Sequence, residues 1–263
     1  MEENALSKKQ TLLFAFIATA VAVALRSAML FFTIDAKSGF IKAEYLFFGG
    51  AILAVIILCA LLIFVFSYIS KGSCEWKEVK TPLFRLVSAF LALVIIYDTF
   101  FAGSRVVGWQ RTVEIIFALV TAVTLVMVAL GDSISITPPA VLSIVPVLYW
   151  FMRLVIVFSA FSSLATIPDN VFELSALCLM LISALWYAKA ICLGVEGKQK
   201  AFTEPVFLTT AFVCFTTAIP RLAIMLSGNE SLLHKTWLPV MTPIAAGIYF
   251  LVFALSNTLS KNK

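Results

Sequence analysis

The chain has 263 residues, of which 62% are hydrophobic and only 13% are charged, and its formal net charge is +5. Soluble domains carry roughly 25% charged residues, so this composition excludes an ordinary water-soluble globular protein. Lysine and arginine collect on the cytoplasmic side of membrane proteins, where they face anionic lipid, so the positive charge needs no nucleic acid as a partner. We therefore expect a protein of the cell membrane with membrane lipid as its surroundings.

Apolar runs of about 20 residues, long enough to cross roughly 30 Å of hydrocarbon as a helix, occur eight times. They are Thr11 to Phe32, Tyr45 to Ile69, Leu83 to Phe101, Val113 to Leu130, Val141 to Phe161, Val171 to Leu193, Val206 to Leu226 and Leu238 to Leu259. The connections between them are too short to fold as soluble domains. The sequence therefore predicts an all-α, multi-pass membrane protein with eight transmembrane helices.

The basic residues between the spans predict the orientation of the chain. The termini and the loops after the second, fourth and sixth spans contain nine of them: Lys8, Lys9, Lys71, Lys77, Lys80, Lys198, Lys200, Lys261 and Lys263. The opposite loops contain five: Lys37, Lys42, Arg105, Arg111 and Lys235. Because basic residues favour the cytoplasmic side, we expect both termini to be cytoplasmic.

The spacing of unusual residues, more than residue identity, indicates an internal repeat. A shift of 127 residues places Arg26 on Arg153, and a shift of 123 residues places Asp98 on Arg221. We interpret the chain as two tandem four-helix repeats, residues 1–132 and 133–263. Duplicated halves often form a transport site between them, although duplication also builds membrane proteins that carry nothing.

Charged residues inside the spans are the main candidates for a functional site. Each costs roughly 2.5–3.5 kcal/mol at the centre of a span, so such residues face the bundle interior and pair. With cytoplasmic termini, six of them fall in the outer half of the bilayer: Arg26, Asp98, Glu114, Arg153, Glu173 and Arg221. We expect an arginine to neutralise Asp98, and the most economical pair is Asp98 with Arg221, between the third and seventh spans.

Helical spacing adds polar neighbours to these charges. One stripe recurs at i, i+4, i+7 and i+11 along the seventh span: Thr210, Cys214, Thr217 and Arg221. Tyr149 lies four residues before Arg153 and shares its helix face. The expected ligand-binding residues are therefore Arg26, Asp98, Tyr149, Arg153, Glu173, Thr217 and Arg221. Three arginines facing one deeply placed acid would attract an anionic group, while Asp98 could instead relay protons.

Catalytic and metal-binding motifs are few. Tyr97-Asp98 and Ala129-Leu130-Gly131-Asp132 resemble the YD and GxGD motifs of intramembrane aspartyl proteases, but an alanine replaces the first glycine. The two aspartates are also expected at opposite membrane faces, whereas a catalytic pair must lie within a few Å. A single histidine, His234, excludes histidine-based zinc sites and catalytic triads. We expect no metal and no cofactor, and catalysis on lipid is only the third hypothesis.

Two hypotheses of function come first. One is a permease or ligand-binding membrane subunit for a small, anionic solute or lipid, in which ATP-driven transport would need a partner ATPase subunit. The alternative is a non-transporting scaffold or sensor subunit that acts through partner helices and whose buried charges are structural ion pairs. Arginines that face a cavity favour the first hypothesis, and arginines buried against carboxylates favour the second.

Overall fold

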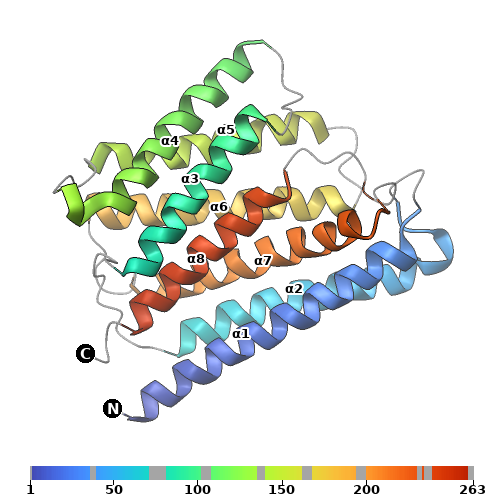
Figure 1. Cartoon of the computed structure of the whole chain (residues 1–263). Coiled ribbons are helices and arrows are strands. Elements are labelled where there is room, and N and C mark those ends of the chain that lie inside the picture. The colour runs from blue at the N-terminus through green and yellow to red at the C-terminus, as the bar shows by residue number, and fades with distance from the viewer. Residues whose placement is uncertain are drawn as a thin grey trace.

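The chain folds as a bundle of long helices (Figure 1). The computed structural model describes residues 2–35, 40–70, 81–101, 108–134, 140–161, 168–193, 200–229, 233 and 239–259. The long helices are α1 (Glu2–Ala28), α2 (Leu46–Ile69), α3 (Pro82–Phe100), α4 (Trp109–Ile134), α5 (Val145–Phe161), α6 (Pro168–Leu193), α7 (Lys200–Leu226) and α8 (Met241–Leu259). Short turns, η1 (Met29–Thr33), η2 (Ala43–Tyr45) and η3 (Ala140–Ile144), adjoin α1, α2 and α5.

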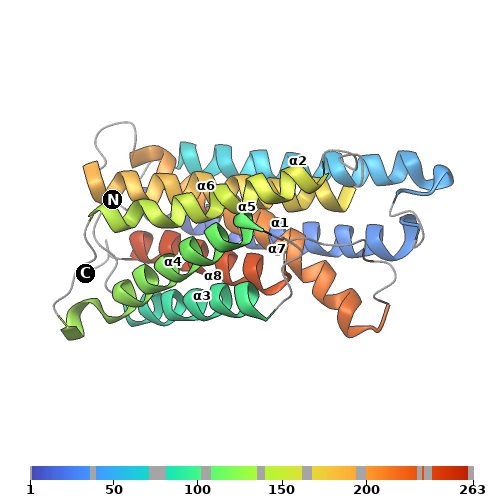
Figure 2. The ribbon, with the colours of Figure 1, turned by 90° about the horizontal axis from the view of Figure 1, so that it is seen from above.

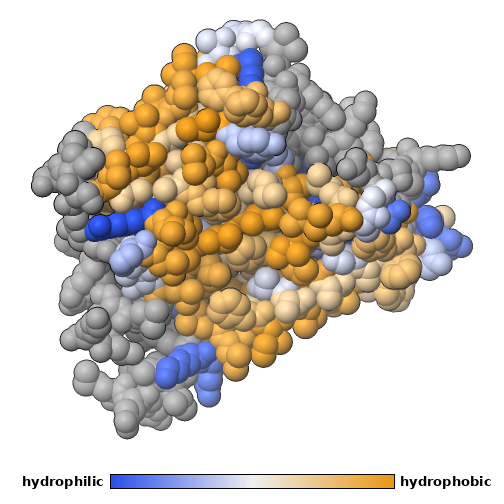
Figure 3. All heavy atoms as spheres, viewed as in Figure 1, coloured by the Kyte–Doolittle hydropathy of each residue, from blue (hydrophilic) through white to orange (hydrophobic). Residues whose placement is uncertain are grey.

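The predicted fold class is confirmed. In the described part of the chain, seven helices are long and apolar enough to cross a membrane, and α8 contributes a shorter apolar helix. Figure 3 shows a mostly apolar surface across the middle of the molecule, with hydrophilic residues gathered toward the helix ends. Large apolar side chains such as Phe47 and Leu86 are exposed, as expected for a surface that faces lipid.

Local sequence explains where two helices begin. The Thr81 hydroxyl accepts a hydrogen bond from the Phe84 backbone N–H at 3.3 Å, and Pro82 occupies the first helical position of α3. α6 also begins with a proline, Pro168, three residues before the predicted start of this span. Asp169 is therefore part of the first turn of α6, where a negative charge complements the helix dipole.

Six helices form a closed ring. α3 packs on α4, α4 on α5, α5 on α6, α6 on α7, α7 on α8, and α8 packs back on α3. α1 and α2 pack on each other and along α7, and Figure 2 shows the bundle at right angles to the first view. Of the apolar window of α7, 78% of the residues are buried, against 22% for α2. α7 is therefore the helix that joins the α1–α2 hairpin to the ring.

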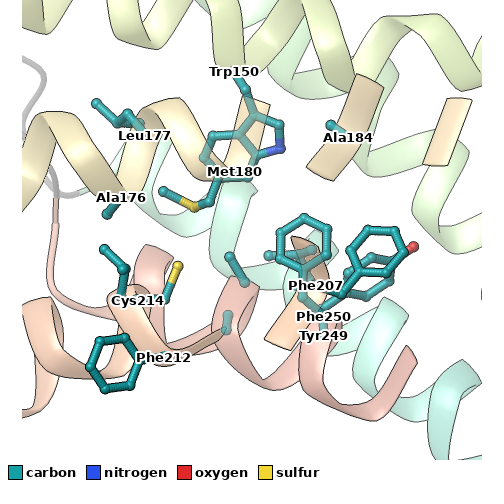
Figure 4. Close-up of a cluster of buried hydrophobic side chains, with 14 of the residues drawn as sticks. Trp150, Ala176, Leu177, Met180, Ala184, Phe207, Phe212, Cys214, Tyr249 and Phe250 are labelled. Carbon is teal, nitrogen blue, oxygen red and sulfur yellow. The ribbon is translucent and has the colours of Figure 1, made fainter. Parts of the chain in front are cut away.

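Aromatic and sulfur-containing side chains fill the interior of the ring. Figure 4 shows Trp150 of α5 beside Met180 of α6, with Phe207, Tyr249 and Phe250 gathered nearby on α7 and α8. The rings of Phe207 and Phe250 stack with their centres 5.6 Å apart. This core holds the four helices together and leaves little free volume between them.

α1 begins and α8 ends at the same end of the bundle (Figure 1), as an even number of membrane crossings requires. The cytoplasmic location of that end stays a prediction, and so does the division into repeats 1–132 and 133–263. Many basic residues that predict the orientation lie outside the described residues, namely Lys37, Lys71, Lys77, Lys80, Arg105, Lys198, Lys235, Lys261 and Lys263. His234 lies outside them as well.

Candidate functional site: two buried charge clusters

The predicted site residues lie in two separate groups of contacts. The first cluster joins α1, α6 and α7 and consists of Arg26, Asp169, Glu173 and Arg221. The second cluster joins α3, α4, α5 and α8 and consists of Asp98, Arg111, Glu114, Arg153 and Thr242. Among the described residues, each cluster contains two arginines and two carboxylates, so within this part of the chain neither has the predicted excess of positive charge.

In the first cluster, Arg221 and Asp169 form the central ion pair. Arg221 Nε donates to both carboxylate oxygens of Asp169, at 3.2 and 3.1 Å, and its Nη2 donates to Oδ2 at 2.8 Å. The same Nη2 lies 3.4 Å from Glu173 Oε2. Arg26 Nη2 also donates to Asp169, and its guanidinium carbon lies 3.5 Å from the centre of the Phe172 ring. Since Asp169 binds both arginines, this one carboxylate links α1, α6 and α7.

The first cluster is closed to its surroundings. The side chains of Arg26, Arg221 and Glu173 are completely buried. Some guanidinium nitrogens of the two arginines have no hydrogen-bond acceptor. Phe172, however, covers one face of Arg26, and a cation–π contact of this kind partly replaces hydration. This arrangement is that of a buried ion-pair network between helices.

The predicted polar stripe of α7 is present and buried, and its Thr210, Thr217 and Arg221 side chains contact α6. Thr210 Oγ1 lies 2.7 Å from Ser183 Oγ of α6. Thr217 Oγ1 donates to the Val213 carbonyl at 2.7 Å and lies 3.4 Å from the Phe172 carbonyl. The Thr217 hydroxyl is therefore engaged with backbone oxygens, and it positions α7 against α6.

In the second cluster, Glu114 occupies the centre. Its Oε1 accepts a hydrogen bond from Arg153 Nη1, and its Oε2 lies 3.1 Å from Arg111 Nη1. Arg111 Nη2 also donates to the Thr99 carbonyl at the end of α3. Asp98 Oδ2 accepts a hydrogen bond from the Thr242 hydroxyl at the start of α8. These contacts connect α3 with α4, α5 and α8.

Several buried polar atoms of this second region have no hydrogen-bond partner in the described part of the chain. They are Asp98 Oδ1 and Nε and Nη2 of Arg153, and the hydroxyls of Thr99 and Tyr149 have no partner beyond their interaction with each other. Arg153 interacts electrostatically with both Asp98 and Tyr149, so these groups share one neighbourhood between α3 and α5. More than nine-tenths of buried polar groups in proteins have a partner, which is often an ordered water. The region is therefore suited to hold water or a small polar ligand.

A small cavity of about 30 Å³ lies inside the ring, next to the second cluster. Its lining includes Ile95, one turn before Asp98 and Thr99, and Trp150, which follows Tyr149. The lining is largely apolar but contains the hydroxyl groups of Thr121, Thr124 and Ser143. A volume of this size accommodates one water molecule.

Two wider apolar crevices flank α7. One, of about 370 Å³, lies between α1 and α7, and the other, of about 300 Å³, lies between α2, α6 and α7. Exposed apolar residues such as Phe16 and Leu61 line them. None of the seven predicted site residues lines these crevices, although Arg26, Glu173 and Thr217 contact or adjoin Phe172, which lines the second one.

The predicted pairing of Asp98 with Arg221 is wrong. Arg221 pairs with Asp169 and Glu173, whereas Asp98 contacts Thr242. The prediction failed because Asp169 was assigned to the loop before the sixth span. The sequence does indicate that Asp169 belongs to the helix. It follows a proline, which can occupy the first position of a helix, and it precedes Glu173 by four residues, so that both share one helix face.

Arg111 is the second functional candidate that the sequence prediction did not include, because it was counted as a loop residue. It lies in the first turn of α4, three residues before Glu114, and these two residues form an ion pair on one helix face. Asp98 and Asp132 lie near opposite ends of the antiparallel α3–α4 pair, which agrees with their separation predicted from the sequence. Among the described residues, no group of three or more potential metal ligands is close enough to hold a metal ion.

Comparisons with known proteins found no match to any family model, curated protein or solved structure. Function therefore has to be inferred from the geometry of these side chains.

Proposed function

We propose that this protein is a membrane permease, or a ligand-binding membrane subunit, for a small polar solute that binds at the second cluster. The observation that supports this proposal is the group of buried polar atoms on Asp98, Thr99, Tyr149 and Arg153 whose hydrogen-bonding capacity is not fully used within the described part of the chain. Intramembrane charges that retain unused hydrogen-bonding capacity are typical of solute and ion pathways. A small cavity inside the ring, lined by Ile95 and Trp150 among others, lies one helical turn from Asp98 on α3 and adjoins Tyr149 on α5, and in this proposal the path opens from it.

The proposed solute differs from the one expected from the sequence. An anion was predicted because three arginines faced one deep carboxylate. In the second cluster, Arg111 and Arg153 are balanced by Glu114 and Asp98, so a net positive charge does not select the solute. A small molecule that both donates and accepts hydrogen bonds fits the unpartnered atoms better than an anion does.

The first cluster has a different role in this proposal. Arg26, Glu173 and Arg221 are fully buried and take part in ion pairs that link α1, α6 and α7, although Arg26 and Arg221 also retain nitrogens without an acceptor among the described residues. Thr217 is bonded to backbone carbonyls. These predicted ligand residues fasten the α1–α2 hairpin and α7 to α6. The same observation favours the second candidate function, a non-transporting scaffold or sensor subunit whose buried charges are all structural.

Cysteine accessibility separates the two candidates. In a variant without the five native cysteines, Thr99→Cys and Thr121→Cys introduce thiols at the second cluster and in the ring cavity. Leu93→Cys on α3 and Val123→Cys on α4 are matched controls, because their side chains are exposed to lipid. Asn229→Cys, exposed after the end of α7, measures complete labelling. The probe is a membrane-impermeant, charged methanethiosulfonate applied to vesicles of both orientations.

A permease must open its binding site to water, so we expect Thr99→Cys and Thr121→Cys to react faster than the two lipid-facing controls. Equal and negligible labelling of all four positions, with Asn229→Cys fully labelled, would contradict the permease and support the scaffold. Comparing negatively and positively charged reagents at Thr99→Cys then measures the charge preference of the path.

A further inference from the structure

Asp98 differs from the other buried carboxylates of the two clusters in its hydrogen bonds. Glu114 accepts from two arginines, and so does Asp169. Asp98 is also buried, with 3% of its surface exposed, yet among the described residues its single hydrogen bond comes from the hydroxyl of Thr242. Its other oxygen, Oδ1, has no donor in the described part of the chain.

The groups around Asp98 come from three helices that pack at this end of the ring. α4 presents Arg111 and Glu114, α5 presents Tyr149 and Arg153, and α8 presents only the Thr242 hydroxyl. Both arginines direct nitrogens to Glu114, and Arg153 acts on Asp98 through space without an ion pair within 4.0 Å. The negative charge of Asp98 is therefore stabilised less than that of Glu114.

Each protonation state of Asp98 carries one energetic penalty. When Asp98 is ionised, the four charges of the cluster cancel, but Oδ1 is a buried anionic oxygen without a donor. When Asp98 is protonated at Oδ1, the new O–H can donate to a hydroxyl or a water, but the cluster retains one uncompensated arginine. Because the two states carry opposite penalties, a proton can be gained or lost here more readily than at Glu114 or Asp169.

We propose that Asp98 is a proton-binding site that exchanges a proton with water. In the forward step a proton from water forms an O–H bond at Oδ1, and in the reverse step that bond breaks and the proton returns to water. The Thr242 hydroxyl continues to donate to Oδ2 in both states. The proposal is independent of whether the protein transports a solute, since it concerns only the carboxyl group and its access to water.

Infrared spectroscopy of the full-length protein in lipid vesicles tests this directly. As the pH falls, the wild type should gain a C=O stretching band of a protonated carboxylic acid in apolar surroundings, and Asp98→Asn should lose that band. Glu44→Gln, which removes an exposed carboxyl group, should leave it unchanged. The band should shift on transfer to D₂O, because the proton exchanges with water. Thr242→Val removes a donor to the ionised form and should move the midpoint of the titration to higher pH.

A second measurement covers the case in which Asp98→Asn does not fold. Dicyclohexylcarbodiimide modifies protonated carboxyl groups in apolar surroundings, and peptide mass spectrometry of the wild type should locate it at Asp98 in preference to Glu114 and Asp169. The proposal is overturned if the titrating band persists in Asp98→Asn or if no such band forms wherever the protein stays folded. Modification of Glu114 or Asp169 in place of Asp98 would overturn it as well. Failure of the cysteine-labelling test would leave the infrared result unaffected, so the two proposals can fail separately.

Discussion

At the scale of single residues, the two aspartates show how environment decides the role of a carboxylate. Asp169 binds two arginines from different helices, whereas Asp98 is held by one hydroxyl. Removing one partner of a buried ion pair costs about 3–5 kcal/mol, because the remaining charge stays buried without compensation. The two aspartates should therefore respond very differently to the same substitution.

Asp169→Asn should lower the free energy of unfolding by about 3–5 kcal/mol, because Arg26 and Arg221 lose the charge that they share. Titration with sodium dodecyl sulfate in mixed micelles, followed by circular dichroism, measures this loss. Glu44→Gln is the control and should have no effect. In a double-mutant cycle, Arg26→Leu should destabilise less in the Asp169→Asn background than in the wild type. Additive effects of the two substitutions would contradict the shared pair.

At the scale of helices, α3 and α8 are joined by polar contacts at both ends. Thr81 at the start of α3 lies 3.3 Å from Ser256 near the end of α8, and Asp98 bonds to Thr242 at the opposite end. Close packing between α7 and α8 continues the ring. A β-carbon added at Gly247 of α8 would lie 3.1 Å from the Cys214 β-carbon and 3.0 Å from the Phe215 ring. Gly247 therefore allows the two helices to approach.

Gly247→Ala should lower the free energy of unfolding by about 1–3 kcal/mol, because an added methyl group overpacks the α7–α8 contact. Gly50→Ala on α2 is the matched control, since nothing lies within 4 Å of the added β-carbon. That control should be neutral or stabilise by up to about 1 kcal/mol, because alanine loses less chain entropy than glycine in a helix. Thermal unfolding of both variants in one detergent compares them. Equal stability of the two variants would contradict this prediction, because it would show that the α7–α8 contact accommodates the added methyl group without loss of stability.

At the scale of the whole molecule, the ring and the α1–α2 hairpin meet along α7 and at the first cluster. Arg26 of α1 contributes an ion pair to Asp169 and a cation–π contact to Phe172, both on α6. The hairpin is therefore held to the ring by α7 packing and by one charged contact to α6.

The orientation of the whole molecule predicts a simple accessibility pattern. Epitope tags at both termini should be protected from protease in intact cells, because the distribution of basic residues favours cytoplasmic termini. Asn229→Cys, after the outward-running α7, should react with an impermeant thiol reagent added outside. Permeabilised cells are the control for tag cleavage. Cleavage of the tags in intact cells, together with a protected Asn229→Cys, would reverse the orientation.

Sequence alone determined the class of the protein and the burial of its charges. Eight apolar runs predict membrane-spanning helices because a backbone in lipid must satisfy its own hydrogen bonds. The face of α7 that carries Thr210, Thr217 and Arg221 was predicted from helical spacing, and the structure buries it against α6. These properties follow from local periodicity and from the cost of placing charge in lipid, so they can be predicted from the amino-acid sequence alone.

Only the tertiary structure decided which charges meet. Arg26 and Asp169 are 143 residues apart, and Asp98 and Thr242 are 144 apart, so no local pattern specifies either contact. Helix order around the ring places α8 beside α3, and that neighbour gives Asp98 a hydroxyl where an arginine was expected. The start of α6 also differs from the prediction. The helix begins at Pro168, three residues before the predicted start of the span, so Asp169 lies in its first turn and forms ion pairs there. Apolar helices pack with many alternative neighbours at similar energy, so the arrangement depends on the whole set of interhelical contacts.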